Sequence, residues 1–451
     1  MRGKSSTNPA RQQRENFSAI SMADFPESRT KTAMTGKIIV VGAGIIGATA
    51  ALRLAEAGWD VALCDGNPPG SEAGASYGNG GWISPASIIP MSMPGLWRKV
   101  PAFLLDRNGP LTIDWTSLPQ LAPWLLRFLW AGASRTRVRR TAKLLNFLLH
   151  DGPERHLELA RKIGQDQLIL QKGLLYAYPD RASFEAEALS WELRRENGVA
   201  YVEWDEAELR KRLPALSPSY RFAVHVVNGA HCRDTGRYVA GIVEEAQRKG
   251  VQFHQSTVTA ILDGAMPQVV LESGETLSAD RIVIAAGIYS GRLLHRLGVR
   301  IPMQSERGYH VTVASGQTPF EIPVMPSTGR MANTPTDMGL RLSGQVELAT
   351  VDKPPNWERA QVLQRHALAS YPYLSEDKTP KLRLWMGHRP STPDGLPVIG
   401  PLSRHPALIA AFGHGHVGIA AAPKTADLVL EAVENRVNDD ALPFLPSRFR
   451  Q

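Results

Sequence analysis

The stretch IIVVGAGIIGATAA, residues 38–51, decides the fold of this 451-residue chain. Its first four residues are apolar and β-branched, as in a buried strand, and small residues suited to a helix follow its glycines. In that context Gly42 permits a tight turn, Gly44 lets a pyrophosphate approach the backbone, and Gly47 lets the helix pack on the strand. The stretch therefore indicates a dinucleotide-binding turn.

A second strand, WDVALC (59–64), follows the helix and leads into Asp65. A carboxylate at this distance from the glycines accepts hydrogen bonds from the ribose of a bound dinucleotide, and the start of the helix offers free N–H groups to its phosphates. The candidate contacts from this turn are Gly42, Ala43, Gly44, Ile45, Ile46, Gly47 and Asp65. These residues alone leave open which dinucleotide is bound.

Composition limits the remaining function classes. A chain of 451 residues predicts two domains, and 43% hydrophobic residues suffice for their cores. The net charge of +8 favours anionic partners, but no nucleic-acid-binding motif accompanies it. Two cysteines, Cys64 and Cys232, exclude a disulfide framework and a cysteine-based metal site.

The first 36 residues differ from the rest because they are polar and contain no apolar segment. They lack the hydrophobic region of a secretory signal, and we expect a disordered extension. Translation from Met34 is an alternative, in which residues 1–33 are absent. We expect a cytoplasmic protein, because no run of apolar residues is long enough to cross a membrane.

The region from residue 103 to 211 is mostly helical in pattern. Within it, WLLRFLW (124–130) precedes a cluster of arginines between residues 135 and 140. Packing of these helices on their own domain is the preferred interpretation. A peripheral contact with the inner face of the cytoplasmic membrane remains the alternative.

Residues 234–287 again show a helix followed by strands, as in the dinucleotide-binding part of the chain. Asp234 or Thr235 can cap a helix that ends at Gly250, and the buried strand RIVIAAG (281–287) follows a hairpin. The parallel sheet therefore resumes after a long insertion. Alternating strands between residues 301 and 385 predict an antiparallel sheet in a second domain.

Four further segments carry a family resemblance. They are ASYGNGGWISP (75–85), IVIAAGIYS (282–290), GHRPSTPDGLPVIGP (387–401) and GHGHVGIA (413–420). With the glycine turn, they resemble the D-amino-acid oxidase superfamily of flavoproteins, and within it the bacterial D-amino-acid dehydrogenases. The resemblance covers nearly the whole chain after residue 36.

This resemblance implies the cofactor and the fold class. The cofactor is FAD, expected to be non-covalent, and the fold is α/β, with a discontinuous Rossmann-like FAD-binding domain and an α+β substrate domain that contains an antiparallel sheet. The predicted segments are the extension (1–36), FAD-binding parts at 37–102, 225–300 and 385–440, substrate-domain parts at 103–224 and 301–384, and a C-terminal tail (441–451).

The resemblance also implies further cofactor contacts, from the loop after the second strand, the adenine clamp, the AAG turn and the start of the last helix. They are Ser76, Asn79, Gly80, Gly81, Val258, Gly287, Gly413, Gly415, Val417, Gly418 and Ile419.

Arg389 is the expected substrate ligand, because family members bind the amino-acid carboxylate with an arginine in this segment and a guanidinium matches both oxygens. The alternative is an arginine that satisfies loop carbonyls. Tyr309 adds a hydroxyl to the carboxylate or is a core residue. Glu347 and Arg341 are further candidates for the pocket. No histidine is needed as a base: His388, His414 and His416 are interpreted as hydrogen-bonding wall residues.

The resemblance implies oxidation of a D-amino acid to an imino acid, which water converts to a 2-oxo acid and ammonia. Electrons would pass to a quinone or another carrier. Alternatives are a glycine or sarcosine oxidase of the same fold, a D-hydroxyproline oxidase or dehydrogenase, and a flavin-bearing electron-transfer subunit. The preferred D-amino acid and the oligomeric state stay open.

Overall fold

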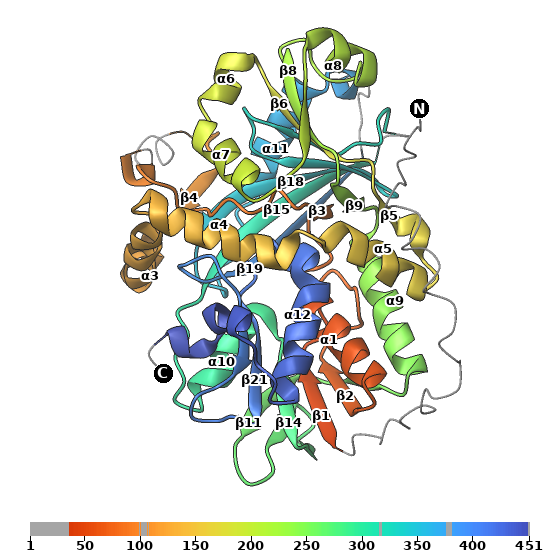
Figure 1. The fold of residues 1–451 in the computed structure, drawn as a ribbon, viewed down its shortest axis with the longest axis vertical. Helices are drawn as coiled ribbons and strands as arrows, with labels where there is room; N and C mark the ends of the chain where they lie inside the picture. The colour runs from red at the N-terminus through yellow and green to blue at the C-terminus, as the bar shows by residue number, and fades with distance from the viewer. Residues whose placement is uncertain are drawn as a thin grey trace, which may run out of the picture. The chain divides into compact units, whose positions relative to one another are not determined.

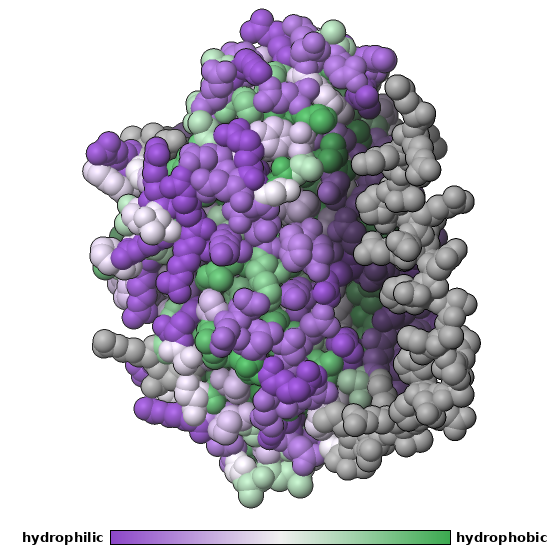
Figure 2. Space-filling model, viewed as in Figure 1, coloured by the Kyte–Doolittle hydropathy of each residue, from purple (hydrophilic) through white to green (hydrophobic). Residues whose placement is uncertain are grey.

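The computed structural model describes residues 36–98, 100, 106, 108–314, 318–375 and 381–449. The predicted disordered extension, apart from Gly36, lies outside these residues. Two large sheets organise the described chain (Figure 1). On the face seen in Figure 2, hydrophilic side chains predominate, with apolar ones scattered between them.

The first sheet has six strands, and the glycine turn follows one of its central strands. Their order is β10 (Gln252–Gln255), β2 (Asp60–Asp65), β1 (Lys37–Val41), β14 (Arg281–Ile284), β21 (Leu408–Phe412) and β20 (Val398–Pro401). The first five are parallel and β20 is antiparallel to β21. Because β1 lies between β2 and β14, its apolar residues are buried on both faces. The predicted return of the chain to the parallel sheet is confirmed.

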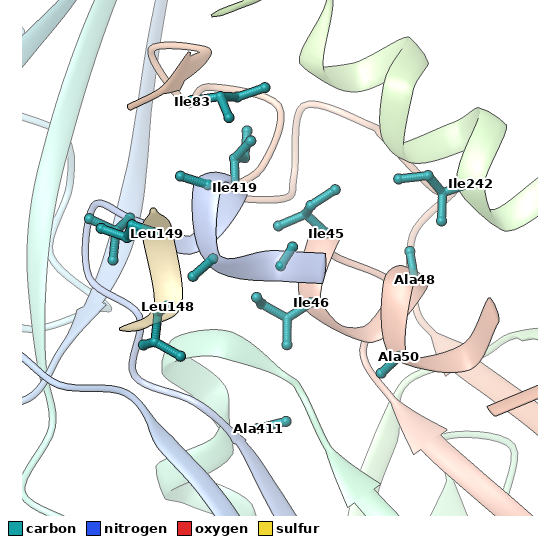
Figure 3. Packing of buried hydrophobic residues seen from close by; sticks show 14 of the residues in the cluster. Ile45, Ile46, Ala48, Ala50, Ile83, Leu148, Leu149, Ile242, Ala411 and Ile419 are labelled. Carbon is teal, nitrogen blue, oxygen red and sulfur yellow. The ribbon is translucent and has the colours of Figure 1, made fainter. Parts of the chain in front are cut away.

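Two helices, α1 (Ile45–Glu56) and α12 (Gly418–Val433), pack on this sheet, and α9 (Thr235–Arg248) packs on α1. The Asp234 carboxylate accepts a hydrogen bond from the Arg237 N–H and so caps α9. The first turns of α1 and α12 share one apolar cluster, in which Ile45 and Ile46 lie near Ile419 (Figure 3). The two glycine-bearing turns that precede these helices are therefore neighbours in space.

The second sheet has nine strands and is mostly antiparallel. Its order is β19 (Lys381–Ser391), β15 (Gln304–Ala314), β18 (Gly339–Leu348), β17 (Ala332–Thr336), β16 (Val324–Pro326), β6 (Leu174–Tyr178), β8 (Phe222–Val226) and β7 (Tyr201–Trp204), with β4 (Leu111–Ile113) beside β18. The predicted strands between residues 301 and 385 are confirmed as β15 and β18, which pair antiparallel. Helix α11 (Glu358–Ser370) packs on one face of these two strands.

Two three-stranded sheets and several helices complete the described chain. The sheets are β11 (Val258–Leu262), β12 (Gln268–Leu271) and β13 (Thr276–Ser278), and β3 (Trp82–Ile83), β9 (Ala230–Cys232) and β5 (Ile169–Leu170). The other helices are α3 (Leu118–Ala131), α4 (Arg135–Leu149), α5 (Gly152–Lys162), α6 (Arg181–Glu185), α7 (Ala188–Glu196), α8 (Glu206–Arg212) and α10 (Ser290–His295). Among the described helices, none is long and apolar enough to cross a bilayer.

The α/β class with a parallel and an antiparallel part is confirmed. The division into seven segments stays a prediction. Strand β19 pairs with β15 as far as Ser391, so the chain leaves the nine-stranded sheet six residues beyond the predicted boundary at 385.

Candidate active site

The three glycines of the opening turn have different surroundings. A Cβ atom on Gly42 would lie 2.5 Å from the Ala285 carbonyl oxygen, and one on Gly47 would lie 1.8 Å from the Gly42 carbonyl oxygen. A Cβ on Gly44 would meet only the Ser76 Oγ, at 3.4 Å. Gly42 and Gly47 are thus required by close packing, whereas the backbone at Gly44 is open to a ligand. This is the arrangement that a bound pyrophosphate needs.

The residues predicted to surround the turn lie beside it. One Asp65 carboxylate oxygen accepts a hydrogen bond from the Ala43 N–H at 2.8 Å, and the Ser76 hydroxyl accepts one from Ile45 N–H at 3.0 Å. Ser76 therefore brings its loop to the start of α1, although 31 residues separate it from Ile45. Val258 begins β11. Its neighbour Thr257 lies beside Gly66, because a Cβ on Gly66 would be 2.3 Å from the Thr257 hydroxyl oxygen, so Val258 lies close to the end of β2.

Arg341 fixes the loop that contains Asn79, Gly80 and Gly81. Its Nη1 donates to the carbonyl oxygens of Tyr77 and Asn79, both at 3.0 Å, and lies 3.1 Å from the Thr235 hydroxyl at the start of α9. The side chain is 1% exposed, and its Nε and Nη2 have no hydrogen-bond partner in the described structure. Arg341 was expected to line the substrate pocket. Its contacts instead show it holding the glycine-rich loop, with two donors that suit a bound polar group.

The turn before α12 adjoins the segment that contains Arg389. The Gly415 N–H donates to the Pro390 carbonyl oxygen at 2.9 Å, and Ser391 forms a bridge with His414. Gly413 and Gly415 have φ angles of +86° and +53°, which favour glycine. Gly287, with φ +56° and no atom within 4 Å of an added Cβ, follows the end of β14. Val417, Gly418 and Ile419 then open α12.

Arg389 lies on β19 directly across from Glu306 on β15. Its guanidinium covers Gly308, because a Cβ there would lie 2.3 Å from the Arg389 Cζ. It donates to the carbonyl oxygens of Gln345 at 2.9 Å and Gly344 at 3.4 Å. These carbonyls belong to a bulge of β18, where Gln345 has a φ of +58°. A non-glycine residue in this conformation is strained, as is common at functional sites.

Glu306 was not identified from the sequence. It is 5% exposed and lines a cavity formed by residues 89–92, α3, α4, residues 391–395 and residues 413–417. Burial raises the pKa of Glu306, whereas Arg389 and the Ser391 hydroxyl act in the opposite direction. Alternation along SERGYH was the available signal, since it places residues 306, 308 and 310 on one face of a strand.

Tyr309 lies on the opposite face of β15 from Arg389. Its hydroxyl donates to the Glu347 Oε2 at 2.5 Å and accepts from the Asn356 N–H at 2.9 Å. Tyr309 is 1% exposed and belongs to the apolar cluster that includes residues of α11. This position favours the core interpretation of Tyr309 over a substrate contact. Glu347, also expected at the pocket, lies on the same far face.

Of the three candidate histidines, His414 and His416 lie at the cavity and His388 does not. His388 contacts the Ser305 hydroxyl at 2.8 Å. His414 contacts the Thr425 hydroxyl at 3.0 Å, and burial lowers the pKa of His414 to about 3. His416 lines the cavity. Surrounding protein and the nearby Arg389 charge lower the pKa of His416 to about 4. The two histidines at the cavity are therefore neutral at pH 7.

Both cysteines are buried. Burial raises the pKa of Cys64 to about 11 and that of Cys232 to about 12, so neither is a ready nucleophile. Across the described ranges, no group of three or more His, Cys, Asp or Glu side chains could hold a metal ion.

A glycine turn lies at the carboxyl edge of a parallel sheet, the backbone at Gly44 is open, and the half-buried Arg389 lies across from the cavity residue Glu306. These features define a dinucleotide-binding protein with an adjoining site for a second ligand. Comparison with known proteins gives the family. The model described as FAD dependent oxidoreductase (DAO) matches residues 37–432, and the chain belongs to this family. FAD is its cofactor.

Relatives and solved structures agree with this membership. A D-amino-acid oxidase of Bradyrhizobium diazoefficiens is 40% identical over 91% of this chain and 98% of that protein. A D-amino acid dehydrogenase of Dechloromonas aromatica is 29% identical over 91% of this chain and 99% of that protein. The glycine oxidase structure from Geobacillus kaustophilus has a TM-score of 0.71 at 22% identity, covering 92% of this chain and all of that one, which is a likeness of fold.

Proposed function

We propose that this protein oxidises D-amino acids to imino acids, which water hydrolyses to 2-oxo acids and ammonia. The observation that carries the proposal is Arg389, a half-buried guanidinium on β19 whose segment adjoins the glycine-bearing turn before α12. Relatives named D-amino-acid oxidase and D-amino acid dehydrogenase support the substrate class. Bound FAD supplies the hydride acceptor, its N5 atom.

The chain's own residues hold the reactants. Arg389 binds the substrate carboxylate by two charge-assisted hydrogen bonds, exchanging its contacts with the β18 bulge carbonyls. The glycine turn, Asp65 and Ser76 hold the ADP portion of FAD, and the start of α12 stabilises negative charge on the flavin ring. The buried thiols of both cysteines accord with non-covalent binding.

The test is anaerobic bleaching of the bound flavin by a substrate panel. D-alanine, D-proline and D-hydroxyproline are compared with their L-isomers, and with glycine and sarcosine. D-isomers should bleach the flavin while L-isomers leave it oxidised. Preference for L-isomers would overturn the stereochemistry, preference for glycine or sarcosine would replace the substrate class, and no bleaching at all would favour an electron-transfer subunit.

For the reoxidation step, we propose a quinone or another carrier as the electron acceptor. Oxygen is the second candidate, because the relative that is 40% identical is named an oxidase. An oxygen electrode separates the two. Stoichiometric hydrogen peroxide at the rate of substrate turnover would establish the oxidase, whereas turnover that requires a quinone analogue would establish the dehydrogenase.

For a membrane-bound acceptor, we propose that α3 makes the peripheral contact. Leu126 and Trp130 of α3 are 70% and 67% exposed, and the guanidinium of Arg137 lies 3.8 Å from the Trp130 ring centroid. Exposed apolar and basic groups together suit an anionic bilayer surface. The protein should sediment with vesicles that contain phosphatidylglycerol and not with pure phosphatidylcholine. Trp130→Glu should abolish this, and Leu368→Glu, at an exposed position on α11, should not.

A further inference from the structure

The buried Glu306 carboxylate lines the cavity, and the half-buried Arg389 guanidinium lies on the neighbouring strand without forming a close pair with it. Glu306 and Arg389 are direct cross-strand partners, yet Arg389 turns its hydrogen bonds to the bulge carbonyls of β18. The two charges interact through space. The Ser391 hydroxyl bonds to Glu306 but carries no charge. A buried carboxylate without a bonded counter-charge is costly, so the arrangement points to a cationic ligand that completes it.

An α-amino acid in its zwitterionic form has the required charges. Cβ atoms of direct cross-strand partners lie about 5 Å apart, and the carboxylate and ammonium groups of the amino acid are attached to one carbon. Such a ligand can bridge the two side chains, with its carboxylate on Arg389 and its ammonium on Glu306. An anionic substrate with a neutral amine would leave the Glu306 charge unpaired.

The other groups at the cavity are not equivalent to Glu306. Asp394, the other carboxylate that lines it, is paired with Arg448 at 2.8 Å. His414 and His416 are neutral at pH 7 for the reasons given above. Residues 89–92 and the parts of α3 and α4 that line the cavity contribute Met91, Ser92, Phe128 and Thr141, among others, and no ionisable side chain.

We propose that Glu306 binds the α-ammonium group of the substrate and accepts its proton before the hydride leaves Cα. The N–H bond breaks and the proton moves to a Glu306 oxygen, which gives a neutral amine and a carboxylic acid. The nitrogen lone pair of the neutral amine would then form the C=N bond of the iminium product as the Cα–H bond breaks, and FAD, when bound, would supply the acceptor for the hydride. Glu306 afterwards releases its proton to water. This role rests on the proposed oxidation of amino acids.

Glu306→Gln tests the role in the FAD-loaded enzyme. The glutamine cannot take a proton, so the variant must select the small fraction of substrate whose amine is already neutral. Between pH 7 and pH 9 its kcat/KM for D-alanine should rise about tenfold per pH unit, whereas that of the wild-type enzyme stays nearly flat. Glu306→Asp should restore the flat profile at a lower rate. A wild-type profile in Glu306→Gln would overturn the proposal.

Ligand binding gives a second readout that does not need turnover. Propionate, which has a carboxylate and no amine, is titrated while the flavin absorbance is followed. Glu306→Gln should bind propionate at least as tightly as the wild-type protein, because a repelling carboxylate is gone, and should bind 2-aminoisobutyrate, an amino acid with no Cα–H bond to break, more weakly. Equal losses for both ligands would mean that Glu306 only supports Arg389, and would overturn the proposal.

Glu347→Gln is the matched control, since it makes the same change at a buried carboxylate on the other face of the sheet. It should keep the wild-type pH profile. The experiments distinguish an error in the proposed function from an error in the role of Glu306. If no D-amino acid bleaches the wild-type flavin, the proposed function is wrong. If D-alanine bleaches it and Glu306→Gln behaves as wild type, only the role of Glu306 is wrong.

Discussion

Each face of the β15–β18–β19 part of the large sheet carries an arginine and a glutamate from neighbouring strands. The two side chains form an ion pair on the far face and do not on the near face. On the far face, Arg307 is fully buried and donates to the carbonyl oxygens of Thr350 at 2.6 Å and Pro354 at 2.9 Å. Glu347 lies 3.4 Å from it and accepts from Tyr309. On the near face, Glu306 lines the cavity, Arg389 lies directly across from it, and the two do not share such a network.

This difference separates a structural ion pair from a binding site. Arg307 and Glu347 bond to each other and to neighbouring groups, and of the Arg307 nitrogens only Nε lacks a partner in the described structure. Such a bonded pair adds rigidity and is not available to a ligand. Glu306 and Arg389 on the near face do not bond to each other, so under our proposal both charged groups remain available to one ligand. One strand, β15, supplies a member to each face because its side chains alternate.

The largest effect is expected from the near face. Arg389→Ala should lower kcat/KM for D-alanine about 1,000-fold, close to 4 kcal/mol of transition-state binding, because two charge-assisted hydrogen bonds are lost. Most of the loss should lie in KM, and the variant should keep its flavin, measured by absorbance. Purification of a flavin-free protein would refute the assignment of Arg389 to the substrate.

Glu347→Gln should have the next largest effect, on stability alone. Arg307 would keep its backbone partners and lose its buried counter-charge, which costs about 3 kcal/mol of the free energy of unfolding. Denaturant titration of the FAD-loaded protein measures this loss. A raised KM for D-alanine in this variant would erase the distinction between the two faces.

The sequence predicted the parts of this molecule whose signals are local. The glycine turn, the strand ending at Asp65 and the cap at Asp234 each depend on residues a few positions apart. Arg389 could be selected because its segment resembles a family motif. Glu306 could not, since its importance arises from pairing with a strand 83 residues away.

Arg341 shows the same limit. It was singled out as a polar residue for the pocket, but its carbonyl partners Tyr77 and Asn79 lie 264 and 262 positions earlier in the chain. Sequence periodicity states which side chains share a face of a strand, and not which loop covers that face. Tyr309 illustrates the converse: once β15 is assigned, alternation alone separates it from residues 306 and 308.

Gly308→Ala tests whether the position of the Arg389 guanidinium matters, because it removes no charge from the near face. The added methyl group would occupy the space of the Arg389 guanidinium and displace it, so KM for D-alanine should rise about 30-fold, near 2 kcal/mol. Steady-state kinetics measures this rise. Gly291→Ala in α10, where an added Cβ would lie 3.6 Å from the Met303 Cε, should leave KM unchanged. An unaltered KM in Gly308→Ala would show that Arg389 can bind substrate from another position.

Tyr309→Phe should have the smallest effect and decides between the two interpretations of this residue. Loss of the hydroxyl removes the bonds to Glu347 and to the Asn356 N–H, which costs about 1 kcal/mol of the free energy of unfolding, measured by denaturant titration. Because the hydroxyl points away from Arg389, KM for D-alanine and the affinity for propionate should not change. A tenfold rise in KM together with a tenfold loss of affinity for propionate would mean that Tyr309 reaches the substrate carboxylate, and the two faces of the sheet would then act on one ligand.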